Sequence, residues 1–405
     1  MKVVVTGVTL TGNLGGCAML YAVKKILSFH IKDFALASIL PKQDRIKNNQ
    51  NLVRIISADY RIWLLFTTPL CLILWAFRKK KFAIWCARKI PILKEFADTD
   101  VIIDLCGISF VDGRGLGLLT YNIAIVLPGL FFDKPVYKLS QAFGPFQNIF
   151  NRTAAKWILD RCSKVVARGQ KTLKYLRKLK IKNVVCYPDT SFALDISPDI
   201  KKKAFSIVNN KITNRKQRRL IIISPSAVVK KYCEKAGSDL VLELCQTIHA
   251  LHEQGMTCAL LPHSTYSGIS KSDDLSVVKT IQERVKLDYA IDVERFDANG
   301  DPRLARAIIG NADAFIACRF HSLIAALSQA IPVVTIGWSH KYTEAVKPFG
   351  MDLYTINYSK IKKYTLVKYV NKLIINRKKI VKVMKIVSKK YKKQAADGIR
   401  LILKN

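Results

Sequence analysis

The stretch "AFIACRFHSLIAALSQAIPVV", residues 314–334, is one complete example of the unit from which we expect the fold to be built. It starts with a continuously apolar run and passes through the polar residues Arg319 and His321. Apolar residues at helical spacing follow, and Pro332 precedes a β-branched run. Continuously apolar strands are typical of parallel sheets covered on both faces, and helices join such strands. The stretch therefore predicts a strand–helix–strand unit in an α/β fold.

Short β-rich runs of the same kind recur along the chain of 405 residues, with helical segments between them. A polar, basic stretch without a strand signal, residues 197–218, separates them into two sets. The runs are "KVVVTG", "DVIIDLCG", "KPVYKLS", "KVVARG" and "NVVCYPD", then "LIIISPS", "CALLPH", "YAIDV", "AFIACR" and "PVVTIG". We predict two doubly wound, Rossmann-like domains facing a cleft, residues 1–196 and 219–352, with ligands at the carboxyl ends of the strands.

The net charge is strongly positive, with 67 Lys and Arg against 29 Asp and Glu, or +38. Such a charge favours a polyanion, an anionic membrane surface, or a phosphorylated or carboxylated substrate as partner. The alternative is that the charge is spread over a solvated surface. The lysine-rich segments lack interleaved aromatic residues and a recognition motif, so we expect no nucleic acid.

The ten cysteines form no Cys-x-x-Cys pair and most lie among apolar residues. This distribution predicts buried thiols in a reducing compartment, with no zinc site and no disulfide framework. The N-terminus runs from a short β-branched stretch directly into a glycine loop, unlike a secretory signal. We therefore expect a cytoplasmic protein that needs no metal.

Residues 62–77, within an apolar and basic insertion at about residues 60–94, depart from the α/β pattern. These 16 uncharged residues precede a basic run and contain Pro69. A helix of this length reaches only about 24 Å, short of the ~30 Å hydrocarbon core, so we expect no transmembrane span. Two interpretations stay open: a helical hairpin lying on the membrane surface, and an apolar helix packed on the sheet.

Residues 360–405 contain sixteen Lys and Arg and one acid, Asp397, together with apolar residues at helical spacing. This pattern predicts one or two basic amphipathic helices. Such a tail either docks its apolar stripe on its own protein or contacts a membrane.

Polar residues at the expected strand ends are the candidates for chemistry. Asn13 and Ser109 lie in turns that contain glycine and follow expected strands. Backbone NH groups at the start of a helix after such a turn can bind an anion. The alternative is a tight turn without a ligand, which has the same sequence pattern. Arg168 and His263 each end a strand. Asp273 is expected to cap the helix that follows His263.

Arg319 and His321 stand at the start of the helix in residues 314–334. The first NH groups of a helix are unpaired and its dipole favours an anion there. Arg319 adds a fixed positive charge, and His321 can exchange a proton near neutral pH. The turn therefore predicts a site that binds an anion and transfers a proton. The alternative is that His321 is a histidine of the protein core with no role in chemistry.

The motifs "GNLGGCAML", "GISFVD", "SQAFGPF", "ARGQKTLKYL", "YPDTSFAL", "LLPHS", "CRFHSLIAALSQAIPVV" and "GWSHKYTEAVKPFG" span most of residues 1–352. In this order they resemble the polysaccharide pyruvyl transferase family. The resemblance implies a fold like that of the two-domain glycosyltransferases of the B class, with the donor site in the second domain. It also implies transfer of the pyruvyl unit of phosphoenolpyruvate to two sugar hydroxyls, which forms a ketal and releases phosphate without a cofactor.

The resemblance assigns roles to particular residues. Arg319, Phe320 and His321 match an arginine–hydrophobic–histidine motif of the family, Arg168 matches an arginine of the first domain, and Lys341 matches a basic residue after the last strand. We expect His321 to donate a proton, with Arg168 and Arg319 clamping the donor and Lys341 stabilising the phosphate that leaves. His263 is expected to orient or deprotonate the acceptor hydroxyl, and the other expected substrate contacts are Phe320, Asn13 and Ser109. Where this chain has Gly16, the family often has an acid.

Two other functions fit the sequence. A nucleotide-sugar glycosyltransferase shares the scaffold, and Glu344 could bind its ribose. A non-catalytic basic protein bound to a membrane or polyanion would use the charge itself. For the pyruvyl transferase, a sugar in a cell-surface polysaccharide or its lipid-linked precursor is the expected acceptor. A lipid-linked acceptor would favour peripheral contact with the cytoplasmic face of an anionic membrane.

Overall fold

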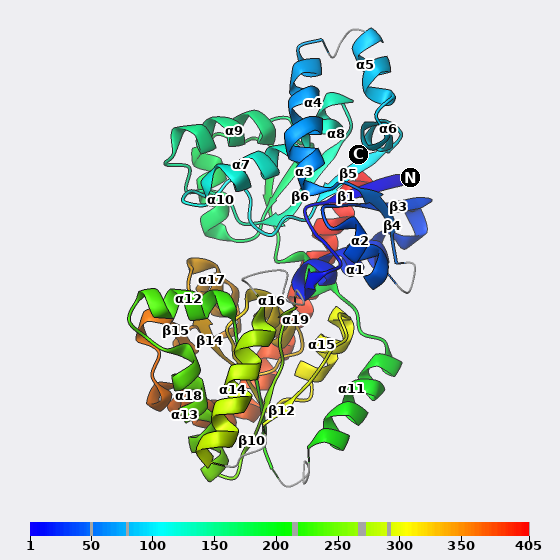
Figure 1. The fold of residues 1–405 in the computed structure, drawn as a ribbon. Helices are drawn as coiled ribbons and strands as arrows, with labels where there is room; N and C mark the ends of the chain where they lie inside the picture. Colours follow the sequence, from blue (N-terminus) through cyan, green and yellow to red (C-terminus); the bar gives the residue numbers. More distant parts are fainter. Residues whose placement is uncertain (49–51, 78–80, 213–217, 266–272, 290–292, 405) are drawn as a thin grey trace. The chain divides into compact units, whose positions relative to one another are not determined.

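The computed structural model describes residues 1–48, 52–77, 81–212, 218–265, 273–289 and 293–404. The chain forms two compact units, each with a sheet and packed helices (Figure 1). Unit 1 consists of residues 1–11, 19–190 and 394–405, and unit 2 of residues 12–18 and 191–393. Two Rossmann-like α/β units are what the strand–helix alternation predicts.

Unit 1 is built on a parallel sheet of seven strands in the order β4-β3-β1-β5-β6-β7-β8. The strands are β1 Lys2–Thr6, β3 Asp33–Ser38, β4 Arg54–Ser57, β5 Val101–Asp104, β6 Val136–Gln141, β7 Lys164–Ala167 and β8 Val184–Cys186. The five predicted runs are confirmed. Strands β3 and β4 lie outside the predicted runs, and β3 has no β-branched residue.

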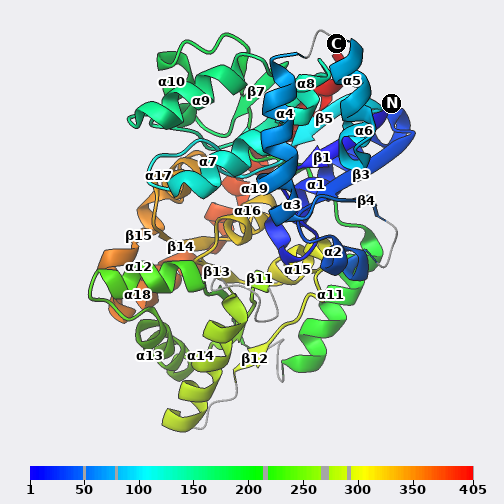
Figure 2. The same cartoon turned by 45° about the horizontal axis from the view of Figure 1, so that its top comes forward.

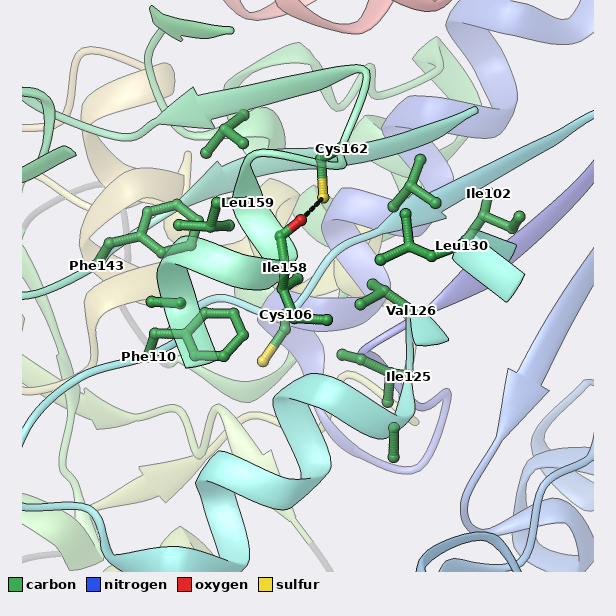
Figure 3. Close-up of a cluster of buried hydrophobic side chains, with 14 of the residues drawn as sticks. Ile102, Cys106, Phe110, Ile125, Val126, Leu130, Phe143, Ile158, Leu159 and Cys162 are labelled. Carbon is green, nitrogen blue, oxygen red and sulfur yellow. Dashed lines mark hydrogen bonds between the residues drawn. The ribbon is translucent and has the colours of Figure 1, made fainter. Parts of the chain in front are cut away.

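Helices cover this sheet. They are α1 Leu14–Leu27, α2 Pro41–Lys47, α3 Tyr60–Ile62, the π-helical turn η2 Trp63–Thr67, α4 Thr68–Trp75, α5 Lys81–Arg88, α6 Pro91–Ala97, α7 Gly115–Ala124, α8 Leu127–Phe131, α9 Ile149–Leu159 and α10 Gln170–Lys178. Figure 3 shows part of the core, where Ile102 of β5, Leu130 of α8 and Ile158 of α9 are buried together. The thiol of Cys162 donates a hydrogen bond to the carbonyl oxygen of Ile158 at 3.4 Å.

One face of the apolar insertion packs on the rest of unit 1, where Trp63 is buried in one cluster with Val4 of β1, Ala35 of β3 and Ile56 of β4. Trp63, Thr67 and Cys71 are buried, and η2 and α4 contact α7 and α8. One face of the insertion is therefore part of the hydrophobic core of unit 1. Within the described parts of the chain, no helix is long and apolar enough to cross a membrane.

Unit 2 is built on a parallel sheet of six strands in the order β12-β10-β9-β13-β14-β15. The strands are β9 Leu220–Ser224, β10 Thr257–Leu260, β12 Glu294–Arg295, β13 Ala314–Ala317, β14 Val333–Gly337 and β15 Thr355–Asn357. The predicted strands β9, β10, β13 and β14 are confirmed. Of the strand predicted at residues 289–293, residues 290–292 lie outside the described residues.

The helices of unit 2 lie on both faces of its sheet (Figure 2). They are α11 Pro198–Lys211, α12 Ala227–Lys235, α13 Leu240–Glu253, α14 Asp274–Tyr289, α15 Pro302–Ile309, α16 Phe320–Ser328, α17 His340–Val346, α18 Lys363–Ile375 and α19 Arg377–Arg400. Helices α14 and α18 pack against α13, while α15 packs against α16. Most of the stretch 197–218, where we expected the domain junction, is α11, and the longer segment of unit 2 begins at Ser191.

The basic tail forms α18 and α19. Its apolar stripe is buried, with Leu366, Leu373 and Met384 fully enclosed, whereas Lys385 and Lys389 are exposed. The stripe therefore docks on the protein and leaves lysines in solvent, as one of the two interpretations of the tail predicts. The tail belongs to both units, because residues up to Lys393 are in unit 2 and the rest are in unit 1.

Candidate active site

The candidate site lies in unit 2, beyond the carboxyl ends of β9 and β13. Strand β9 has β10 on one side and β13 on the other, so the strand order reverses here. In an open parallel sheet, the loops after two such strands lead to opposite faces, and ligands bind where the loops separate. The two predicted residues Arg319 and His321 follow β13 at this point.

A fully buried carboxylate, Asp274, holds the side chain of Arg319. The Arg319 Nε donates to both Asp274 carboxylate oxygens, at 3.0 and 2.9 Å, and its Nη2 donates to Oδ1 at 2.6 Å. The backbone NH of Ala227, in the first turn after β9, donates to the same Oδ1 at 2.9 Å. Asp274 therefore connects the segments that follow β9 and β13, and it fixes the direction of the guanidinium.

The electrostatics of this pair depend on burial. Burial raises the pKa of Asp274, while the Arg319 charge and the hydrogen bonds to the carboxylate oppose that rise. The Arg319 side chain is 18% exposed, against 0% for Asp274. Asp274 is thus a positioning residue under an arginine that reaches the surface of the site.

His321, the second residue of α16, lies directly against Gly15 in the first turn of α1. A Cβ atom at Gly15 would be 2.1 Å from both Cγ and Nδ1 of His321 and 2.6 Å from its Cβ. Glycine is therefore required here because the imidazole approaches the backbone closely. On its other side, the Phe320 ring meets the imidazole edge to face, with centroids 5.5 Å apart.

Gly15 reaches this position through a two-stranded antiparallel ladder. Strand β2, Gly12–Asn13, pairs with β11, Ser264–Thr265, and the NH of Leu14 donates to the carbonyl oxygen of His263 at 3.3 Å. The side-chain oxygen of Asn13 accepts a hydrogen bond from the NH of Gly15 at 2.9 Å. The structure therefore brings the predicted residues Asn13, His263 and His321 together within unit 2.

His263 is buried after β10 and its imidazole is neutral. Burial lowers its pKa to about 3, and electrostatic interactions with His321, Arg319 and Arg306 act in the same direction. A group with such a pKa is a weak general base near neutral pH. Of its two predicted roles, orienting an acceptor hydroxyl is therefore favoured over deprotonating it.

Lys341 of α17 lies among aromatic rings. Its Nζ is 4.7 Å from the ring centroid of Trp338, 5.1 Å from that of Phe320 and 5.6 Å from that of Tyr342. The hydroxyl of Tyr342 donates to the carbonyl oxygen of Cys318 at 3.3 Å, which ties α17 to the turn before α16. Cation–π contacts of this kind hold the ammonium group in place.

The predicted residues Arg168 and Ser109 belong to unit 1. Arg168 follows β7 and forms a buried ion pair with Asp189, Nη1 to Oδ2 at 2.9 Å. Ser109 is fully buried, and its NH donates to the carbonyl oxygen of Ala142 at 3.0 Å. The substrate contacts proposed for these two residues stay predictions.

Three residues of these arrangements were not predicted from the sequence: Asp274, Asp189 and, as a packing position, Gly15. Asp273 caps α14 as predicted, because its Oδ1 accepts a hydrogen bond from the NH of Leu275 at 2.9 Å. Its neighbour Asp274 has no local signal for a partner 45 residues away. Over the described parts of the chain, no group of three or more His, Cys, Asp or Glu side chains is arranged to hold a metal ion.

Solved structures of low sequence identity have the same fold. UDP-GlcNAc 2-epimerase from Neisseria meningitidis, bound to UDP-GlcNAc, superposes with a TM-score of 0.64 at 13% identity, covering 100% of both chains. Alr3699/HepE from Anabaena, in complex with UDP-glucose, has a TM-score of 0.57 at 12% identity, covering 100% of this chain and 99% of the other. At these identities the likeness concerns the fold alone.

Two parallel α/β units and a site at a strand-order reversal define a protein of the glycosyltransferase B fold class. Within this class, the model of the polysaccharide pyruvyl transferase family matches residues 13–340, and the chain belongs to that family. The amylovoran biosynthesis protein AmsJ of Erwinia amylovora is 25% identical over 271 residues, which cover 64% of this chain. The chain spans 62% of the length of that relative. The predicted fold class and family are confirmed.

Proposed function

We propose that this protein transfers the pyruvyl unit of phosphoenolpyruvate to two hydroxyls of one sugar, in a cell-surface polysaccharide or its lipid-linked precursor. The observation that carries the proposal is the start of α16, where Arg319 is oriented by Asp274 and His321 is seated on Gly15. An oriented guanidinium beside an imidazole can bind a carboxylate or phosphate and supply a proton. The family membership of residues 13–340 supports this chemistry.

The proposed reaction balances without a cofactor. The methylene carbon of phosphoenolpyruvate takes a proton, for which we assign His321 as donor, and becomes a methyl group. Two sugar hydroxyls form bonds to the neighbouring carbon and lose their protons. The bond from that carbon to the phosphate oxygen breaks, and phosphate leaves with the second proton beside the Lys341 ammonium.

The roles of the other residues follow from their surroundings. Arg319 would hold the donor carboxylate or phosphate, and Phe320 and Gly15 keep the imidazole in place. His263, neutral and buried, would orient an acceptor hydroxyl. A cytoplasmic location is part of the proposal, supported by ten cysteines that are all thiols, eight of them buried.

Isotope incorporation tests the reaction. The purified protein is incubated in D₂O with phosphoenolpyruvate and a panel of sugars and lipid-linked glycans, and the products are analysed by mass spectrometry and NMR. We expect a pyruvate ketal with one deuterium in its methyl group. A parallel incubation with UDP-sugars in place of phosphoenolpyruvate tests the glycosyltransferase alternative, which the UDP-sugar complexes of the same fold motivate, and a product that carries a transferred sugar would support it.

A further inference from the structure

An exposed apolar face runs along the helix formed by α3, η2 and α4. Its exposed side chains recur at spacings of three and four residues: Ile62, Leu65, Phe66, Leu70 and Ile73. Phe66 is 69% exposed and Ile73 is 63% exposed, whereas Cys71 on the opposite side is 0% exposed. An apolar stripe of this size on the solvent side of a helix indicates an interaction surface.

Helix α5 extends this face. Helices α4 and α5 lie side by side (Figures 1 and 2). Cys71 of α4 and Ala87 of α5 are buried in one cluster with Leu127 of α8, so the opposite sides of both helices point away from α8. On α5, Phe82 is 72% exposed and Trp85 is 56% exposed, and their rings stack with centroids 6.0 Å apart.

Basic residues accompany the apolar ones. Residues 60–94 contain eight Lys and Arg and no Asp or Glu. In α5, Lys81 and Arg88 are exposed, and the Nζ of Lys89 lies 5.1 Å from the ring centroid of Trp85. Aromatic rings flanked by lysines are typical of side chains at a membrane–water interface, where the ring enters the lipid and the ammonium group reaches a headgroup.

We propose that this docking face, defined as Ile62, Leu65, Phe66, Leu70, Ile73, Phe82 and Trp85 with Lys81 and Lys89, binds the protein to an anionic lipid bilayer. The helix of α3, η2 and α4 has one face buried in the protein, so it lies in the plane of the membrane and does not cross it. Charge favours a bilayer over a second copy of the chain, because two chains of net charge +38 repel each other. The proposal does not depend on the reaction.

Vesicle sedimentation without any substrate tests the docking face. We expect the wild-type protein to bind vesicles of equal parts phosphatidylglycerol and phosphatidylcholine, and to bind pure phosphatidylcholine more weakly. The double variant Phe66→Ser, Ile73→Ser should lose about tenfold or more in binding. The matched control Phe205→Ser, Leu353→Ser removes two equally exposed apolar side chains from unit 2 and should bind as the wild type does.

Charge reversal and fluorescence provide independent measurements. Lys81→Glu with Lys89→Glu should remove the preference for phosphatidylglycerol, while the control Lys202→Glu, Lys203→Glu on α11 should keep it. Brominated lipids should quench tryptophan fluorescence in the wild type, and Trp85→Phe should abolish most of that quenching. Thermal unfolding followed by circular dichroism confirms that each variant is folded.

Three results would overturn the proposal. The first is a folded wild-type protein that does not bind anionic vesicles. The second is equal binding by the docking-face variant and its control. The third is a wild-type dimer, found by light scattering without lipid, that Phe66→Ser with Ile73→Ser converts to monomers, because the face would then bind a second copy of the chain.

Discussion

The imidazole of His321 lies so close to Gly15 that any Cβ at position 15 would come within 2.1 Å of two ring atoms. This contact joins the glycine loop near the start of the chain to the arginine–phenylalanine–histidine turn that follows β13. The β2–β11 ladder and the Asn13 side chain hold the glycine loop in place. The glycine loop therefore contributes to the site as the surface on which the imidazole rests.

Gly15→Ala should lower acceptor-dependent phosphate release by about tenfold or more, because the imidazole must swing away from its position. The unfolding temperature should also fall, because the new Cβ would lie 2.6 Å from the Cβ of His321 and no rotation of the imidazole removes that contact. Gly117→Ala, where the nearest atom to a new Cβ is 3.9 Å away, is the matched control and should keep full activity. Wild-type turnover by Gly15→Ala would show that the position of His321 does not matter.

Arg319→Ala should reduce the free energy of unfolding by about 3 kcal/mol, because it leaves the buried Asp274 carboxylate without its guanidinium partner. Urea unfolding measures this loss. As a control, Arg54→Ala removes an exposed arginine that pairs with Asp33 and Glu95, and it should cost about 1 kcal/mol or less. Equal losses in the two variants would contradict the burial argument.

Asp274→Asn tests the positioning role separately from stability. The amide keeps the shape of the carboxylate but loses its charge, so Arg319 is held less firmly. We expect KM for phosphoenolpyruvate to rise about tenfold with a smaller change in kcat, because Asp274 orients a binding group and does not touch the reacting atoms. An unchanged KM in a folded variant would assign Asp274 a structural role only.

His263 should make the protein less stable as the pH falls. Its pKa is about 3 in the folded protein and about 6.5 when unfolded, so the unfolded state takes up the proton first. The contribution of neutral His263 to the free energy of unfolding is therefore fully present above pH 6.5. It decreases by about 1.4 kcal/mol per pH unit below pH 6.5. Between pH 7 and pH 5, the free energy of unfolding measured with urea should fall by about 2 kcal/mol more in the wild-type protein than in His263→Asn. The exposed control His252→Asn should show the wild-type slope, and identical slopes in all three proteins would refute the assignment.

The thiols should react in two groups. Burial raises the pKa of Cys71, Cys162 and Cys258 to about 12, and Cys86 and Cys186 are the two cysteines that are partly exposed. In native protein at pH 8, we expect at most two thiols to react with Ellman's reagent, and all ten to react in guanidinium chloride. Rapid reaction of more than two thiols in the folded protein would contradict the buried positions.

Much of the fold could be predicted because buried parallel strands are continuously apolar, as in residues 314–334. The same rule located Arg319, His321 and His263, since polar residues that end such strands lie at one edge of a sheet. Asp274 and Gly15 could not be predicted as partners of Arg319 and His321, because their contacts join segments far apart in the chain and leave no periodic signal. For residues 62–77 the sequence left two interpretations open, because an apolar run does not show which of its faces is covered.

The most direct test of the proposed function is phosphate release from phosphoenolpyruvate with and without the acceptor panel, by the wild type and by His321→Asn. His252→Asn serves as the histidine control. We predict acceptor-dependent release that falls by about a hundredfold or more in His321→Asn and is unchanged in His252→Asn. Release by His321→Asn at the wild-type rate, in the presence of a sugar that the wild type converts to a ketal, would contradict the assignment of His321 as proton donor.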